Sequence, residues 1–230
     1  MIARGVKTFI ENFDRPQAYT TTPGMNGWTI LDVSSAGTPT YLNVTEDGGA
    51  AQLTFDNTSE AQTIVLYYND VLVYDVRQIN SVWWILKVSS FSAVSTLCAG
   101  VASAYNATPD SVATNAWFRM QGSVSQSNLL VETDDNVTDN DDKATGTTLS
   151  STYKKCLIDF TYGIDDVRFF VDGARVGMGN GATANDGRFS MKGLTAGLNV
   201  QPYLSFQKAS GTTTDQVTVA QFGIQYEWAY

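Results

Sequence analysis

Residues 166–176 read DVRFFVDGARV, and this stretch decides the fold class. An aromatic and β-branched run leads into Asp172-Gly173, a dipeptide that favours a tight two-residue turn. A second short run through Arg175 and Val176 follows the turn. Two extended runs joined in this way predict a β-hairpin. The sequence therefore predicts antiparallel β-structure here.

Similar runs, separated by Gly, Pro, Asn and Asp, recur along the whole chain. The expected strands are 6–13, 28–33, 40–45, 50–56, 63–68, 79–89, 94–105, 116–123, 129–132, 154–162, 166–171, 199–208 and 216–228. Within 82–86 the letters VWWIL lack polar alternation, which favours a strand at the centre of a sheet and leaves a buried helical turn as the alternative. The prediction is an all-β chain with few or no helices, folded as one antiparallel β-sandwich of the jelly-roll kind over residues 1–230. Residues 1–16 could serve as an arm or edge strand that contacts a partner.

Composition excludes several classes of function. The 230 residues contain 14 Lys and Arg against 23 Asp and Glu, a net charge of −9, and no His. A Ser-His-Asp or Cys-His nucleophile and an imidazole-based metal site are therefore excluded. An acidic surface repels phosphates, so nucleic-acid binding is not expected. Charged residues make up only 16%, while apolar residues reach 43%, which is typical of a folded protein rather than a disordered acidic one.

Membrane insertion and secretion are not expected either. The sequence has no run of 18 apolar residues, and the first ten residues lack the apolar stretch of a signal peptide. The chain is therefore expected to be made in the cytoplasm. In that compartment Cys98 and Cys156 are expected to be buried thiols, with a disulfide as the alternative.

The middle of the chain resembles a known group of folds. The stretches that carry the resemblance are 116–123 (AWFRMQGS), 130–135 (LVETDD), 158–160 (IDF) and 167–173 (VRFFVDG). The last resembles the Phe-x-Val-Asp-Gly hairpin of concanavalin A-like lectin, glucanase and laminin G-like sandwiches. The series as a whole resembles sandwich proteins among the virion components of tailed bacteriophages, over residues 70–176. The resemblance implies a jelly-roll fold.

Catalysis is not expected from the resemblance. Glucanases of this fold use two Glu residues that flank an Asp on one strand, as Glu-x-Asp-x-Glu, and this spacing places the carboxyl groups on one face. The sequence contains no such motif, and its Glu residues are widely spaced. The prediction is therefore that the chain is not an enzyme and has no catalytic residues.

An acidic run is the strongest candidate for a metal site. Residues 132–142 hold six carboxylates, which repel one another unless water or a cation neutralises them. Ca²⁺ takes six to eight oxygen ligands, although the spacing is not that of an EF-hand. The run is expected to be a loop, either solvated or holding Ca²⁺, and no other cofactor is expected. The expected ligands are Asp134, Asp135, Asp139, Asp141 and Asp142.

Aromatic residues near loops suggest a second kind of site. Trp28, Tyr19 and Tyr41 are expected close to turns, where exposed rings could stack on sugars. The other tryptophans lie in predicted strands, and their expected role is core packing.

The resemblance and the neutral composition together suggest a structural role. The leading hypothesis is a bacteriophage virion protein, a capsid decoration or cement protein that binds the assembled head and stabilises it non-covalently. Its expected partners are the major capsid protein or other virion proteins and further copies of itself, with a trimer favoured. The alternative is a carbohydrate-binding, lectin-like module of a phage fibre or tail that acts in host adsorption.

Overall fold

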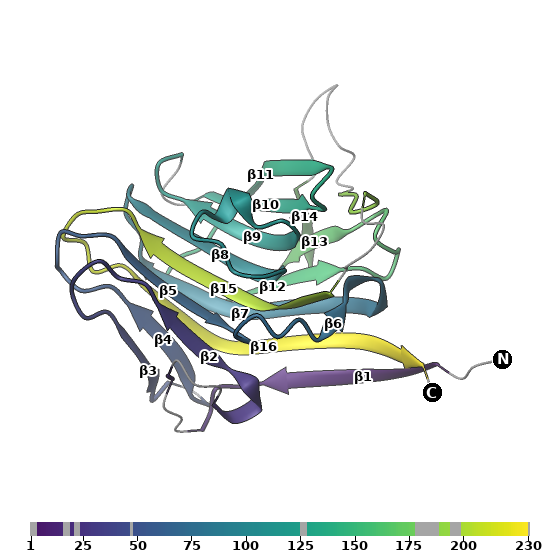
Figure 1. Cartoon of the computed structure of the whole chain (residues 1–230), viewed down its shortest axis with the longest axis horizontal. Helices are drawn as coiled ribbons and strands as arrows, with labels where there is room; N and C mark the ends of the chain where they lie inside the picture. The colour runs from purple at the N-terminus through teal and green to yellow at the C-terminus, as the bar shows by residue number, and fades with distance from the viewer. Residues whose placement is uncertain are drawn as a thin grey trace.

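The chain folds into two antiparallel β-sheets that pack face to face (Figure 1). The computed structural model describes residues 4–15, 19–20, 24–46, 48–124, 128–177, 189–193 and 199–229. Helical structure in this part of the chain is limited to three short 3-10 turns, η1 (Met25–Gly27), η2 (Val76–Gln78) and η3 (Pro109–Ser111). The all-β prediction is confirmed. No helix in the described ranges is long and apolar enough to cross a membrane.

The first sheet, here the β7–β16 sheet, contains the predicted hairpin at Asp172-Gly173. Its strands, in spatial order, are β14 (Ala174–Val176), β13 (Arg168–Val171), β12 (Lys154–Asp159), β7 (Ile79–Ser90), β16 (Gln216–Ala229), β4 (Ala50–Thr54) and β3 (Thr40–Val44), with β1 (Arg4–Glu11) beside β16. Asp172 and Gly173 have φ values of 50° and 83°, which a primed two-residue turn requires. Strand β7 pairs with β12 on one side and β16 on the other, so the run 82–86 is a central strand and not a helical turn.

The second sheet, here the β9–β15 sheet, covers the other side of the core. Its strands, in order, are β11 (Asp139–Thr148), β10 (Asn128–Asp134), β9 (Asn115–Gln121), β8 (Ser95–Ala102), β15 (Asn199–Lys208), β5 (Gln62–Tyr67) and β2 (Thr29–Asp32), with β6 (Tyr74–Asp75) beside β15. Gly100 of β8 lies against β9 so closely that an added Cβ would come within 2.1 Å of the Ala116 carbonyl oxygen. The sequence needs glycine here because the two backbones leave no room for a side chain.

The acidic run was wrongly expected to be a loop. Glu132 and Asp134 end β10, and Asp139 to Asp142 begin β11, so most of the run forms a hairpin at the edge of the β9–β15 sheet. Residues along β11 alternate between exposed and half-buried, since this strand lies at the edge. Edge strands tolerate charged side chains because one side of the strand faces water.

The core lies between the sheets and is rich in aromatic rings. Trp28 contacts Phe13, Tyr68, Trp84 and Phe222, with ring centroids 4.8 to 5.9 Å apart within this group. A second, smaller apolar cluster, which includes Trp117 and Tyr203, lies on the other face of the β9–β15 sheet under Val112. Both cysteines are free, buried thiols, as predicted.

Strand β1 extends the β7–β16 sheet at one end of the molecule. All eight of its residues pair with β16, from Arg4 opposite Ala229 to Glu11 opposite Phe222. The start of β1 and the end of β16 lie together at one side of the molecule (Figure 1). The ring of Phe9 packs near the ring of Phe222, so β1 contacts the core.

Candidate functional site

Three acidic side chains of the β10–β11 hairpin come close enough to share a cation. Oxygens of Glu132, Asp139 and Asp141 all lie within 4.8 Å of one another. We call these three residues the acidic cluster. Asp139 and Asp141 were predicted ligands, whereas Glu132 was counted in the run but not named as a ligand. The alternation of a strand explains this set, because residues two apart on β11 face the same side.

The other three predicted ligands have different partners in the structure. Asp134 accepts a hydrogen bond from the backbone N–H of Asn136 (2.6 Å). Asp135 is buried and accepts from the backbone N–H groups of Val137 (2.9 Å) and Gly193 (2.6 Å), so its carboxylate holds the turn. Asp142 points to the guanidinium of Arg119 (3.4 Å). The five predicted ligands therefore do not form one site, and metal binding stays a prediction.

A buried arginine neutralises one side of this region. Arg119 is only 3% exposed, and its Nη1 lies 3.1 Å from Glu132, 3.4 Å from Asp142 and 2.5 Å from Asp110 of η3. Asn115 donates from Nδ2 to the other oxygen of Glu132 (3.1 Å). The Glu132 side chain is thus fixed by two neighbours from strand β9.

Two carboxyl groups of the acidic cluster, the buried Glu132 and the exposed Asp139, have raised pKa values. Burial raises the pKa of Glu132 to about 7, although the Trp117 indole and the Arg119 guanidinium oppose this effect. Burial and the neighbouring Asp141 carboxylate raise the pKa of Asp139 to about 6. Glu132 is therefore a buried carboxyl with a raised pKa whose two oxygens are held by Asn115 and Arg119.

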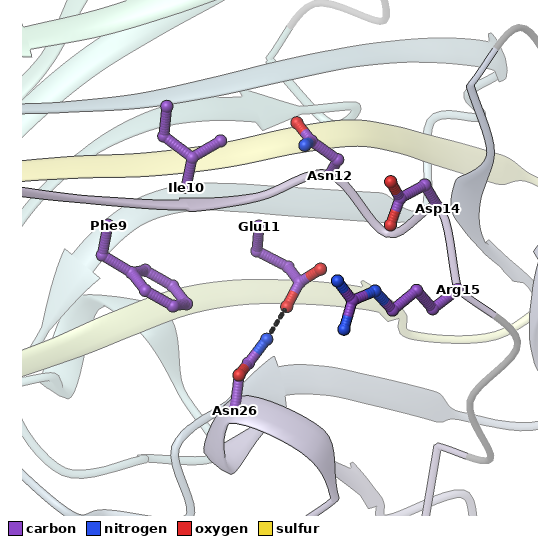
Figure 2. A pocket seen from close by; sticks show the side chains of 7 residues that line it. All are labelled: Phe9, Ile10, Glu11, Asn12, Asp14, Arg15 and Asn26. Carbon is purple, nitrogen blue, oxygen red and sulfur yellow. Dashed lines mark hydrogen bonds between the residues drawn. The ribbon is translucent and has the colours of Figure 1, made fainter.

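A pocket of a different character lies where β1 ends, and we call it the Glu11 pocket. It has a volume of about 260 Å³ and is lined by Phe9, Ile10, Glu11, Asn12, Asp14, Arg15 and Asn26. Figure 2 shows the side chains of Glu11, Arg15 and Asn26 pointing toward one another from β1, the segment after it and η1. Glu11 accepts from the backbone N–H of Phe13 (3.1 Å) and from Nδ2 of Asn26 (2.6 Å), so its carboxylate is held in place.

The backbone around the Glu11 pocket has unusual conformations. Phe13 and Asn26, which both donate to Glu11, have positive φ values of 52° and 58°. A positive φ is strained for a bulky side chain such as Phe13, whose ring is buried in the core. Residues held in this way cluster at functional sites.

A second cavity of about 290 Å³ adjoins the first, and both are lined by Asn12 and Asp14. Its other lining residues are Gly48, Gly49, Ile85, Ala220 and Gln221. Gln221 donates to Asn12 Oδ1 (2.8 Å) and accepts from Trp83 Nε1 (2.7 Å), so a chain of hydrogen bonds orients Asn12. The two cavities thus form one depression across the end of β1, with a polar part beside Glu11 and a part of mixed character beside Ile85.

The aromatic residues expected to stack on sugars are placed differently. Trp28 and Tyr19 are 1% and 5% exposed, and only Tyr41 is partly accessible. The prediction of exposed rings was wrong for Trp28 and Tyr19, because both side chains pack into the core although turns lie nearby. The side chain of Trp228 lies outside the described residues. The Glu11 pocket was missed, although the polar residues Asn12 and Asp14 around Phe13 directly after a strand could have marked it.

Comparison with known proteins gives a result at the level of the fold. No family model matches the sequence, and no curated protein matches it. A solved structure of the endo-acting O-glycanases that human gut bacteria express to initiate mucin breakdown is similar, with a TM-score of 0.62 and 9% identity over 95% of this chain and 98% of that one. The β-glucanase of Bacillus licheniformis has a TM-score of 0.56 and 11% identity, over 94% and 97% of the two chains. The carbohydrate recognition domain of Emp46p has a TM-score of 0.56 and 8% identity, over 94% of each chain.

The similar solved structures establish the fold of the chain. The chain has the concanavalin A-like jelly-roll fold. The expectation that the chain is not an enzyme is corrected here, because the structures that share this fold include glycan-cleaving enzymes. The missing Glu-x-Asp-x-Glu motif excludes one arrangement of carboxylates and not the activity as such. The comparisons contain no support for a place in a bacteriophage virion, which stays a prediction.

Proposed function

We propose that this chain is a carbohydrate-binding protein and that the Glu11 pocket, with the adjoining cavity, holds the glycan. The observation that carries the proposal is the convergence of carboxylate, amide and guanidinium groups on one depression beside an aromatic ring. The neighbours support the ligand class, since they include a carbohydrate recognition domain and enzymes that act on glycans.

The chemistry of the pocket matches that of a sugar. Sugar hydroxyls both donate and accept, and Glu11, Asp14 and Asn12 offer acceptors while Arg15 and Asn26 offer donors. The ring of Phe9 supplies an apolar wall for the C–H groups of a pyranose. Two adjoining cavities of similar size suit two consecutive sugar units.

The polar groups are held in place before any ligand arrives. Glu11 is fixed by a backbone N–H and by Asn26, and Asn12 is fixed through Gln221. A site whose side chains are already oriented loses little conformational entropy on binding, which favours affinity. The strained backbone at Phe13 is consistent with a conformation kept for this purpose.

A glycan array followed by calorimetric titration tests the proposal. Asn12→Ala and Asp14→Ala remove exposed side chains shared by both cavities, so we expect intact folding and an affinity at least about tenfold lower, which is 1.4 kcal/mol for each variant. Glu60→Ala, an exposed carboxylate away from the depression, is the matched control and should bind like the wild type. Binding that survives both pocket substitutions would place the glycan elsewhere and refute the proposed site.

Glycan cleavage is a second candidate function, favoured by one observation. Carboxyl oxygens of Glu132 and Asp139 lie within 4.8 Å, and retaining glycosidases place two carboxyl groups about 5 Å apart. The raised pKa of Glu132, about 7, is the property of a general acid. Release of reducing ends from any glycan that binds, and its loss in Glu132→Gln, would establish this function.

A further inference from the structure

Among the described residues, strand β1 has a partner strand on one side only. All eight residues pair with β16 on one side. No backbone hydrogen bond from residues 4–11 to any other described segment occurs on the opposite side. An open edge of this length is a template for another strand, and Lys7 in its middle restricts which strands can pair with it. The edge also carries two exposed apolar residues, Val6 and Ile10, at 56% and 48% exposure.

We propose that this edge pairs with β1 of a second copy of the chain, antiparallel about a two-fold axis, so that the β7–β16 sheets of two molecules become one continuous sheet. A two-fold axis makes the same surface meet itself, which is the usual way in which soluble proteins form dimers. Pairing gives the backbone N–H and C=O groups along both edges hydrogen-bond partners at once.

The alternation of a strand restricts the register of this pairing. Successive residues of an antiparallel strand direct their backbone groups to opposite edges, so every residue that faces the open edge has the same parity. Residues that stand opposite each other across the axis must therefore both be even or both be odd. Two registers centre on the strand, one with Thr8 on the axis and one with Lys7 on the axis.

The side chains favour the register with Thr8 on the axis. That register places Val6 opposite Ile10 of the second copy and Thr8 opposite Thr8, so β-branched residues meet across the whole centre. Cross-strand pairs of this kind are stabilising. Placing Lys7 on the axis would instead set two ammonium groups opposite each other, which is destabilising. The same pairing brings the two exposed apolar side chains of each strand into contact with their counterparts on the second copy.

Disulfide trapping tests the contact and its register together. We expect Thr8→Cys to form a covalent dimer under mild oxidation, because the two cysteines would face each other at the axis. Val6→Cys serves as the matched control. In the proposed register, position 6 of one molecule lies four residues along the strand, roughly 13 Å, from position 6 of the other, and no disulfide spans this distance. The native thiols do not interfere, since Cys98 and Cys156 are buried.

Sedimentation or light scattering of the unmodified chain gives the independent readout. We expect a dimer for the wild type and a monomer for Val6→Lys, whose exposed position leaves the fold intact, as a circular dichroism spectrum would confirm. A monomeric wild type or a trimer would overturn the proposal. Cross-linking of Thr8→Cys no faster than that of Glu60→Cys, an exposed control, would overturn it as well.

Discussion

The free energy of unfolding should carry a large pH dependence that comes from one residue, Glu132. The ordinary pKa of this carboxyl, 4.5, rises to about 7 in the folded chain, mainly because the group is buried. A pKa raised by folding stabilises the folded state below the unfolded value and loses that contribution as the pH rises through the folded value. One pKa unit corresponds to 1.36 kcal/mol, so the raised pKa of Glu132 contributes about 3 kcal/mol to the free energy of unfolding at low pH.

The experiment compares the wild type with Glu132→Gln in chemical unfolding from pH 4.5 to 8. The amide cannot ionise, so the wild type should lose about 3 kcal/mol relative to the variant across this range. For a chain of this length the corresponding change in melting temperature is about 6–12 °C. Because the chain has no His, few other groups titrate between these limits.

If the free energies of unfolding of the wild type and of Glu132→Gln changed in parallel with pH, the reasoning would be refuted. Parallel changes would mean that Glu132 titrates near its ordinary pKa, so that Arg119 and water compensate its burial in full. Glu60→Gln, the same substitution at an exposed carboxylate, provides the control for the effect of the amide itself.

Further predictions concern packing, thiols and cations. Gly100→Ala should destabilise the fold by about 2–3 kcal/mol in denaturant unfolding, because the added Cβ meets the backbone of β9. Cys98 and Cys156 should not react with a thiol reagent until denaturant is added, since burial shields both thiols and raises the pKa of each. Ca²⁺ should raise the melting temperature, and Asp139→Asn should abolish that rise, because the acidic cluster would lose one of its three carboxylates; an equal rise in both proteins would contradict this assignment.

Most of the strands could be predicted because their signals are local. The hairpin at Asp172-Gly173 needs only a turn dipeptide and two extended runs, and the structure contains it as expected. The strand β11 was missed for a physical reason. Its first residues are polar and acidic, and an edge strand needs no buried face to form. What holds it is the backbone pairing with β10, which no periodicity in the sequence reveals.

The candidate sites depended on contacts that the sequence does not encode locally. The Glu11 pocket joins β1 to η1, and its second cavity joins β1 to Gln221, more than 200 residues away. The acidic run was found from composition, but the side chains that come together differ from the expected ligands. Three of the expected carboxylates already interact with Arg119 or with backbone N–H groups. The density of carboxylates in the sequence therefore predicted where the acidic cluster lies, but not which side chains come together in it.

Strand β1 is the element on which both proposals depend, and its geometry separates them. Val6 and Thr8 lie in the middle of the strand, where their substitution alters the open edge. Asn12 and Asp14 follow the strand and line the two cavities. The mid-strand positions and the cavity positions do not overlap. Substitutions at the two sets can therefore show whether dimer formation and glycan binding occur independently of each other. Loss of both properties on removal of residues 1–11, with neither lost in the single variants, would instead mean that β1 acts only by completing the sheet beside β16.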